Sequence, residues 1–460
     1  MPNPTHAISI NPATGEQIGS YPYDSEADLH AVLDRATAAY ARWRGTTVAD
    51  RCAMLKRLGD ALRADIDRLA GMITAEMGKP ITQARGEIEK CAGTCAWYAE
   101  NGGRMMAPEP TSVEKDAAWI EFRPLGTILA VMPWNFPIWQ VIRSVVPALV
   151  AGNTYILKHA PNVMGSAYLL REVFARAGFP DDVFQVANLT NDLVSQAIAD
   201  DRVAAITLTG SVRAGAAIGS QSGLALKKCV LELGGSDPFI VLPDADLDDA
   251  VRAAILGRFQ NTGQVCAAAK RFIVHRDVAD AFTERFVAGT KALVVGTPTD
   301  AATYIGPMAR FDLRDELHNQ VQRSIQEGAE LLLGGRKQDG PGNFYEPTVL
   351  ANVTSAMTSF REEMFGPVAS IIRADDADHA LALANESQFG LTATVYSGDV
   401  QAARDMAAKL EVGGVFINGY SASDPRVAFG GVKKSGFGRE LSHFGVREFC
   451  NVQTVWLGRR

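Results

Sequence analysis

The chain has 460 residues, 47% hydrophobic and 21% charged, a balance typical of a globular protein too long for one core. Its formal net charge of -7 means that the chain has no excess of basic residues to bind phosphates, so nucleic acid is excluded as a partner. The six cysteines are irregularly spaced, which excludes a disulfide framework and favours a reducing compartment. We therefore expect a cytoplasmic protein of two or three domains.

No targeting or membrane segment is expected either. The first ten residues lack the charged and apolar parts of a signal peptide. The uncharged run 124–142 approaches the length of a membrane span, but three prolines, an asparagine and a glutamine interrupt it. A buried strand followed by a turn fits this run better.

The first hundred residues are predicted to be mainly helical. Residues 11–16 form a turn between two short strands. Ser25 and Asp28 are spaced as a capping box, and helical periodicity follows with breaks from about Ala27 to Tyr98. Gly102-Gly103 is predicted to end this helical region.

A polar, strand-like segment, Thr111 to Arg123, then predicts a projecting hairpin. From Gly126 onward, short apolar runs alternate with helical stretches, which indicates parallel sheets. The first series of strands is predicted at 127–132, 154–157, 183–186, 204–208 and 228–232, with helices at 166–177 and 193–199. A second series is predicted at 239–242, 271–274, 329–333, 369–372, 393–396 and 414–417. We predict an α/β fold with two doubly wound domains.

Cys266 is the cysteine whose surroundings best suit a nucleophile. Small and polar residues precede it, Gly263 allows a tight turn, and three alanines follow. A reactive thiolate needs access and a favourable local field, whereas most unpaired cysteines are small core residues. Residue type alone leaves both alternatives open. Cys91 and Cys95 have no histidine cluster nearby, so no metal site is expected.

Other chemically capable residues follow predicted strands, where ligands of open α/β sheets bind. Asn135 lies in a turn flanked by prolines and aromatics, which indicates an immobilised amide. Glu232 ends an apolar strand before two glycines; burial would raise its pKa and suit proton transfer. Residues 209–215 resemble a phosphate-binding turn opening a helix, and Glu363 is a second fixed carboxylate.

These motifs together resemble the aldehyde dehydrogenase superfamily, and Arg143 and Ser423 extend the resemblance to its succinate-semialdehyde dehydrogenases. The resemblance covers essentially the whole chain. It rests on the following motifs in this order: PWNFP with Asn135, Lys158 after a strand, TGS at 209–211, LELGG with Glu232, NTGQVC with Cys266, and EMFGPV with Glu363. Residues 11–16 and the closing motif 429–436 resemble the ends of the family.

The resemblance implies a catalytic set of Cys266, Glu232 and Asn135. The Cys266 thiolate would attack an aldehyde, and Asn135 with the backbone N–H of Cys266 would hold the oxyanion. Hydride transfer from the thiohemiacetal would leave a thioester, and Glu232 would activate water to release the acid. Glu232 also favours hydrolysis over acyl transfer to coenzyme A. A disulfide switch beside the nucleophile is not expected, because Ala268 occupies the second position after it.

The resemblance also implies a nicotinamide cofactor, NAD or NADP. Its binding residues would be Trp134, Lys158, Gly210, Ser211, Leu233, Glu363 and Phe365. Relatives committed to NAD often have a glutamate three residues after the lysine, whereas this chain has Pro161. Nothing acidic there would repel a 2′-phosphate, so we expect use of both cofactors.

Substrate residues are predicted from the same resemblance. Arg143 lies eight residues after Asn135, where many relatives that take apolar aldehydes have an aromatic residue. A guanidinium there would bind a carboxylate, although a structural ion pair is the alternative. The predicted substrate residues are Arg143, Gln260, Ser423 and Arg426. Some succinate-semialdehyde dehydrogenases have a second arginine where this chain has Gln260, and Arg426 is considered as its replacement. Succinic semialdehyde is the expected substrate, with glutaric semialdehyde as an alternative.

Two further alternatives are a broad-range aldehyde dehydrogenase and a non-catalytic protein with the same fold. Retention of Cys266, Glu232 and Asn135 argues against the second. From the resemblance we expect an NAD(P)-binding domain (1–106 and 125–234), a catalytic domain (235–430) and a small β oligomerisation element (107–124 and 431–460). A homodimer or homotetramer is expected.

Overall fold

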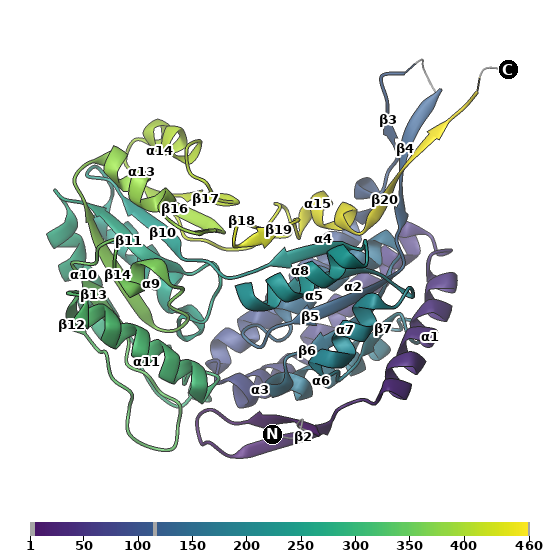
Figure 1. Cartoon of the computed structure of the whole chain (residues 1–460), viewed down its shortest axis with the longest axis horizontal. Helices are drawn as coiled ribbons and strands as arrows, with labels where there is room; N and C mark the ends of the chain where they lie inside the picture. Colours follow the sequence, from purple (N-terminus) through teal and green to yellow (C-terminus); the bar gives the residue numbers. More distant parts are fainter. Residues whose placement is uncertain (1–4, 114–116, 459–460) are drawn as a thin grey trace.

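The computed structural model describes residues 5–113 and 117–458. Two lobes, each built on a largely parallel sheet, lie side by side, and a β arm projects from the molecule (Figure 1). The predicted α/β class with two wound domains is confirmed.

The sheet of the first lobe has six strands in the order β19-β9-β8-β5-β6-β7. Its strands are β5 (Thr127–Met132), β6 (Thr154–His159), β7 (Phe184–Val186), β8 (Val203–Thr209), β9 (Lys228–Glu232) and β19 (Gly436–Phe437). β5 to β9 run parallel, whereas β19 pairs antiparallel with β9. The chain moves outward from β5 to β7 and returns to the other side as β8 and β9. Such a reversal of strand order opens a ligand crevice beyond the carboxyl ends of the strands.

Helices surround this sheet, and a hairpin of β1 (His6–Ile10) and β2 (Gln17–Pro22) lies at the molecular edge (Figure 1). The helices are α1 (Glu26–Trp43), α2 (Val48–Ala64), α3 (Ile66–Met77), α4 (Ile81–Met105), α5 (Trp139–Ala151), η1 (Pro161–Val163), α6 (Met164–Arg176), α7 (Asn191–Ala199) and α8 (Val212–Leu224). The predicted capping box is confirmed: Ser25 accepts from the backbone N–H of Asp28, whose carboxylate accepts from that of Ser25.

The second lobe has a seven-stranded sheet in the order β12-β13-β14-β11-β10-β16-β17. Its strands are β10 (Asp237–Val241), β11 (Ala269–His275), β12 (Glu330–Leu333), β13 (Thr348–Ala351), β14 (Val368–Ala374), β16 (Thr392–Tyr396) and β17 (Gly414–Ile417). Its helices are α9 (Leu247–Phe259), η2 (Gln260–Gly263), α10 (Ala279–Lys291), α11 (Phe311–Gln326), α12 (Thr358–Arg361), α13 (Ala377–Asn385) and α14 (Val400–Ala407). All strands are parallel except β12, which pairs antiparallel with β13 at the edge.

The arm is a three-stranded antiparallel sheet. It contains β3 (Glu109–Pro110), β4 (Ala118–Pro124) and β20 (Cys450–Trp456), in the order β20-β4-β3. The predicted hairpin is therefore present, although residues 114–116 within it lie outside the described ranges. The remaining elements near the C-terminus pack on the body of the molecule: β18 (Val432–Lys433) pairs with β15 (Phe389–Gly390), and α15 (Ser442–Glu448) lies against α5.

One predicted helix end was wrong, and one strand was not predicted. Gly102-Gly103 does not end the helical region, because α4 continues through both glycines to Met105. A Cβ at Gly102 would lie 2.8 Å from Cys52 Sγ and 3.1 Å from Val150, so this glycine lets α4 pack closely on α2 and α5. The expected strand at 329–333 belongs to the antiparallel edge of its sheet, and its partner β13 was not predicted.

Among residues 5–113 and 117–458, no helix is both long and apolar enough to cross a membrane. Within the same ranges, no three His, Cys, Asp or Glu side chains are grouped so as to hold a metal ion.

The two neighbouring glycines of α4 provide a matched test of this packing. Gly102→Ala is expected to destabilise the fold by about 1–3 kcal/mol, because the methyl group overpacks a tight contact. Gly103→Ala, where a Cβ meets nothing within 4 Å, is expected to stabilise it by roughly 0.5–1 kcal/mol through helix propensity. Thermal unfolding midpoints of the two variants check this. A shift of both midpoints in the same direction would contradict the close packing at Gly102.

Candidate active site

The backbone immediately before Cys266 is strained. Asn261 (φ 54°), Thr262 (φ 55°) and Gly263 (φ 71°) all have left-handed conformations. Asparagine and glycine tolerate that region, whereas a β-branched threonine rarely adopts it. Thr262 is held there by Gly306, because its Oγ1 donates to the carbonyl and accepts from the N–H, both at 3.1 Å. Strain that the surroundings enforce in this way is common at functional sites.

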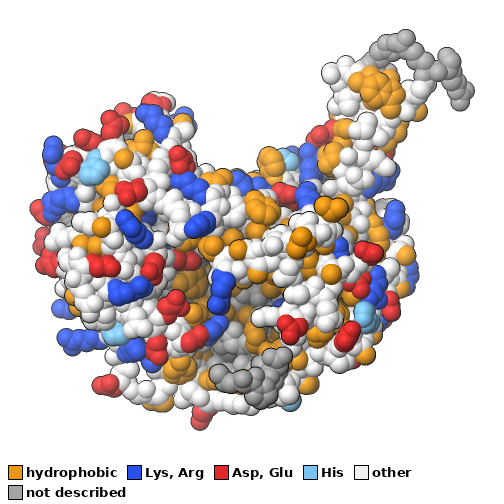
Figure 2. Space-filling model, in the orientation of Figure 1, with side chains coloured by type: hydrophobic (Ala, Val, Ile, Leu, Met, Phe, Trp, Pro, Cys, Tyr) orange, Lys and Arg blue, Asp and Glu red, His pale blue; other side chains and the backbone are white. Residues whose placement is uncertain are grey.

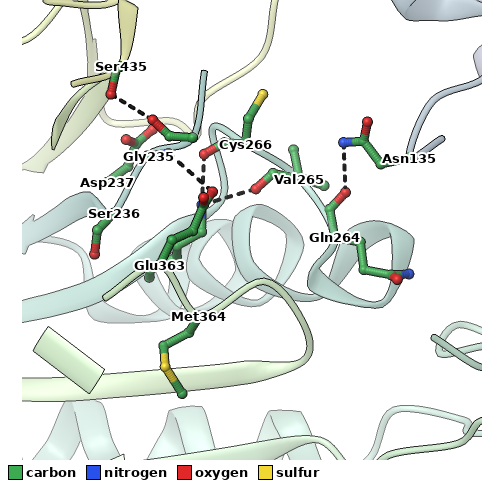
Figure 3. Close-up of polar contacts among 12 residues, drawn as sticks. Asn135, Gly235, Ser236, Asp237, Gln264, Val265, Cys266, Glu363, Met364 and Ser435 are labelled. Carbon is green, nitrogen blue, oxygen red and sulfur yellow. Dashed lines mark hydrogen bonds and ion pairs between the residues drawn. The ribbon is translucent and has the colours of Figure 1, made fainter. Parts of the chain in front are cut away.

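Lys270 holds the backbone at the nucleophile itself. Its Nζ donates to the carbonyls of Val265 (3.0 Å) and Cys266 (2.7 Å), and lies 3.5 Å from the carboxylate of Glu363. In Figure 3 the sulfur of Cys266 points away from Glu363, on the opposite side from these carbonyls. The loop is thus tied down through its backbone, which leaves the thiol available.

Asn135 is bonded directly to the same loop. Its Nδ2 donates to the backbone carbonyl of Gln264 at 3.0 Å (Figure 3), and the backbone carbonyl of Asn135 accepts from Asn261 Nδ2 at 2.8 Å. The side chain is 4% exposed. An amide nitrogen carries two hydrogens, so Asn135 retains a second donor for a ligand.

The turn that carries Asn135 is fixed from α4. Glu87 Oε1 accepts from the backbone N–H groups of Ile138 and Trp139, each at 2.9 Å, at the start of α5. A carboxylate at this position satisfies unpaired donors and interacts favourably with the helix dipole. Lys79 forms a fully buried ion pair with Glu87 and balances its charge.

Cys266 and Asn135 line a cavity of about 700 Å³. Its other walls come from residues that directly follow β5, β8 and β9, and from α11. The structure brings eight of the predicted site residues to this cavity: Trp134, Asn135, Gly210, Ser211, Leu233, Cys266, Glu363 and Phe365. The space-filling view shows the hollowed region between the lobes (Figure 2).

One end of the cavity suits a dinucleotide. Ser211 caps α8 by accepting from the N–H of Ala214 at 3.3 Å, so the positive end of α8 opens beside Gly210. A helix N-terminus with free N–H groups is a general binding site for phosphate. The rings of Trp134 and Phe365 meet edge to face at 5.8 Å across the cavity wall.

Lys158 lies near the end of β6 and does not line the cavity. It is 8% exposed, and burial lowers its pKa to about 8. Within the described ranges, no carboxylate lies within 4.0 Å of its Nζ. Burying an ammonium without a counterion costs free energy, so this environment suits a residue that binds an anionic or polar ligand.

Glu232, the last residue of β9, is buried beside this cavity and close enough to Cys266 for the two charges to interact. Burial raises its pKa well above that of an ordinary glutamate, and Arg143 opposes the shift. A Cβ on Gly430 would lie 2.6 Å from Oε1, so the carboxyl packs against that backbone. Neither carboxyl oxygen has a hydrogen-bond partner among the described residues. Glu232 itself does not line the cavity, although the next residue, Leu233, does.

Arg143 forms a buried ion pair with Glu440. The guanidinium also donates to Thr209 Oγ1 at 3.3 Å and lies 4.9 Å from the ring centre of Phe429. Backbone hydrogen bonds of 2.8 Å in both directions between Phe429 and Glu440 place this carboxylate. Arg143 therefore forms a structural ion pair, which was the alternative interpretation of this residue. Its charge also acts on Cys266 and Glu232.

The remaining predicted substrate residues lie in different settings. Ser423 Oγ accepts from Lys90 Nζ at 2.9 Å. Gln260 is exposed at the end of α9. Arg426 is exposed and bound through two nitrogens by Asp424 on its own loop, at 2.7 and 2.8 Å. The structure therefore offers no contact that links Arg426 to Arg143.

The model of the aldehyde dehydrogenase family matches residues 2–455. The chain belongs to this family.

Individual relatives are similar over the whole length. The chain is 64% identical to the succinate semialdehyde dehydrogenase [NAD(P)+] Sad of Escherichia coli, covering 99% of this chain and 98% of that protein. It is 48% identical to a succinate-semialdehyde dehydrogenase [NADP(+)] of Mycolicibacterium paratuberculosis, covering 98% and 96%. A crystal structure of succinic semialdehyde dehydrogenase from Streptococcus pyogenes in complex with NADP+ superposes with a TM-score of 0.96 at 37% identity. That match covers 98% of this chain and all of that one.

Sequence reasoning missed two charged residues that contact predicted site residues: Glu440, which pairs with Arg143, and Lys90, which donates to Ser423. Glu440 follows the predicted closing motif, but nothing in the spacing connects it with Arg143. Lys90 lies within a predicted helix, where a lysine is normally a solvated surface residue. Neither residue carried a signal in the sequence that set it apart.

The thiol of Cys266 is expected to react slowly at neutral pH in the free enzyme. Burial raises its pKa to about 11, against the opposing charges of Arg143 and Lys270. The reactive thiolate fraction should therefore rise about tenfold per pH unit from pH 7 to 10. Mass spectrometry of iodoacetamide labelling at Cys266 measures this, and Cys266→Ser provides the control. A rate that is already constant between pH 7 and 9 would contradict a raised pKa.

Proposed function

We propose that this chain oxidises succinic semialdehyde to succinate, with NAD or NADP as hydride acceptor. The observation that carries the proposal is the meeting of Cys266, Asn135 and the N-terminus of α8 in one cavity. A nucleophile, a fixed oxyanion donor and a phosphate-binding helix end are the parts that this reaction requires.

In the proposed mechanism, the thiolate of Cys266 attacks the aldehyde carbon. The developing oxyanion receives hydrogen bonds from the second N–H of Asn135 and from the backbone N–H of Cys266. Because Asn135 is already fixed by Gln264 and Asn261, it needs little reorganisation. The product of this step is a thiohemiacetal on Cys266.

A bound nicotinamide cofactor would supply the hydride acceptor that oxidation of the thiohemiacetal to a thioester requires. Gly210 and Ser211 would hold its phosphates, Lys158 and Glu363 its riboses, and Trp134, Leu233 and Phe365 would line the nicotinamide end. Glu232 then takes a proton from the water that attacks the thioester. Its raised pKa means that this step accelerates as pH rises and the carboxyl loses its proton.

The substrate assignment rests on positive charge and on the named relatives. Arg143 and Lys90 are two neighbouring cationic groups: each charge acts on the other, and that of Arg143 also acts on Cys266. Such groups favour an aldehyde with a distal carboxylate over an uncharged one. The relatives from E. coli and M. paratuberculosis are both named for succinate semialdehyde.

A second candidate is a broad-range aldehyde dehydrogenase for uncharged aldehydes. The ion pair between Arg143 and Glu440 favours it, because a guanidinium neutralised inside the chain binds a substrate carboxylate less strongly. Arg143→Leu is a poor test of the two candidates, since it would leave Glu440 buried without its counterion.

We also propose that the chain forms a homodimer or a pair of dimers through the arm. The arm projects from the body (Figure 1), and its strand β20 exposes Val452 and Trp456 by 58% and 64%. The proposal includes the predicted cofactor-binding and catalytic segments. It also includes the predicted oligomerisation element, of which β3, β4 and β20 form the projecting arm. A cytoplasmic location is proposed as well, supported by six cysteines that are all free.

The reaction is tested by following reduced cofactor with succinic semialdehyde, butanal and benzaldehyde, each with NAD and with NADP. We expect kcat/KM for succinic semialdehyde to exceed that for butanal by at least roughly tenfold, as one charge-assisted contact provides. Both cofactors should support turnover, because Pro161 presents no carboxylate to a 2′-phosphate. Equal values for butanal and succinic semialdehyde would favour the broad-range candidate.

The role of Glu232 is tested by Glu232→Gln. Acylation of Cys266 does not require this base, so a burst of reduced cofactor close to one equivalent should remain. Steady-state turnover should fall by roughly 10²–10⁴-fold, the usual contribution of a general base. Stopped-flow absorbance and the mass of the acylated Cys266 peptide measure these effects. Steady-state turnover equal to that of the unaltered enzyme would show that another group activates water.

A further inference from the structure

Lys90 occupies a partly buried position where three segments of the chain meet. It belongs to α4, and its ammonium lies 4.2 Å from the ring centre of Trp139 on α5. The same Nζ donates to Ser423 Oγ at 2.9 Å, in the loop that follows β17. One ammonium thus joins residues whose positions in the chain are far apart.

The charge of Lys90 is not paired with any carboxylate of the described residues. Among residues 5–113 and 117–458, no carboxylate lies within 4.0 Å of its Nζ. The nearby Asp424 is bound by Arg426. Burial, and then repulsion from Arg143, lower the pKa of Lys90 to about 8. An anion bound at Nζ would relieve both effects.

The other cations predicted for the substrate carboxylate are already paired. Arg143 is bound by Glu440, and Arg426 is exposed and bound by Asp424. Gln260 stands where a second arginine would supply charge, and its amide is neutral. Lys90 is therefore the cation of this region that keeps its charge available to a ligand.

Lys90 lies close to Arg143, on the helix that contacts the nucleophile loop. Trp139 and Arg143 are four residues apart on α5 and share a helix face, so the ammonium above Trp139 lies beside Arg143. Two turns earlier on α4, Gln83 Oε1 accepts from the N–H of Asn261 at 2.7 Å. This face of α4 therefore runs along the loop that leads to Cys266.

We propose that Lys90, with the hydroxyl of Ser423, binds the distal carboxylate of the aldehyde and so determines substrate specificity. This inference rests on the proposed oxidation of a carboxylated aldehyde. The ammonium would exchange its contact with the Trp139 ring for an ion pair, while Ser423 donates its hydroxyl hydrogen to the second carboxylate oxygen. The charge that Gln260 does not supply would then come from a different element of the fold.

The test compares Lys90→Met, Lys90→Arg and, as a matched control, Lys56→Met at an exposed position on α2. For Lys90→Met, KM for succinic semialdehyde should rise by roughly ten- to a hundredfold, as expected for loss of a charged hydrogen bond. Its kcat, and kcat/KM for butanal, should stay within about twofold because the reacting atoms are untouched. Lys90→Arg should recover most of the affinity, and Lys56→Met should behave as the unaltered enzyme.

Titration calorimetry with succinate provides a second readout that needs no turnover. Succinate should bind the unaltered enzyme and Lys90→Arg, and bind Lys90→Met at least tenfold more weakly. Unchanged KM and succinate affinity in Lys90→Met would overturn the proposal, as would an equal loss of butanal and succinic semialdehyde activity, which marks a structural role. Failure of the proposed function can be distinguished from failure of the Lys90 proposal. If the proposed function is wrong, the unaltered enzyme itself will not prefer succinic semialdehyde to butanal.

Discussion

The active site depends on a reciprocal pair of hydrogen bonds between its two lobes. Asn135, in the turn after β5, donates to the carbonyl of Gln264, and Asn261 donates back to the carbonyl of Asn135. One lobe carries the oxyanion donor and the other carries the nucleophile. These two contacts fix the distance between Cys266 and the amide that its reaction needs, and preorganisation of this kind is a large part of catalysis by electrostatic stabilisation.

Buried charges organise the space around that contact. Glu87 with Lys79 fixes the start of α5, and Lys270 with Glu363 fixes the backbone of the nucleophile loop. These paired charges fix the backbone on both sides of the site. Two lysines, 158 and 90, are instead buried or partly buried without a carboxylate within 4.0 Å among the described residues. They lie on different elements of the first lobe, β6 and α4, and we assign them to the anionic or polar groups of cofactor and substrate respectively.

Much of the fold follows from local patterns. Runs such as Thr127–Met132 and Lys228–Glu232 are apolar, bounded by turn residues and of strand length, so their extents were predicted correctly. Gly102 misled the prediction because a glycine that ends a helix and one that permits close helix packing look alike in sequence. The β13 strand was missed because its four residues carry too little periodicity to stand out.

The sequence by itself determined the chemistry: which residue types occur, and that strands end beside Asn135, Gly210 and Glu232. Those positions depend on patterns within a few residues, which local rules describe. Only the tertiary structure decided which charges are neutralised. Lys90 meets Ser423 across 333 positions of chain, and no local rule predicts a contact formed by packing of distant elements. The cation that we assign to the substrate could therefore not be predicted before the fold placed Glu440 beside Arg143 and left Lys90 without a counterion among the described residues.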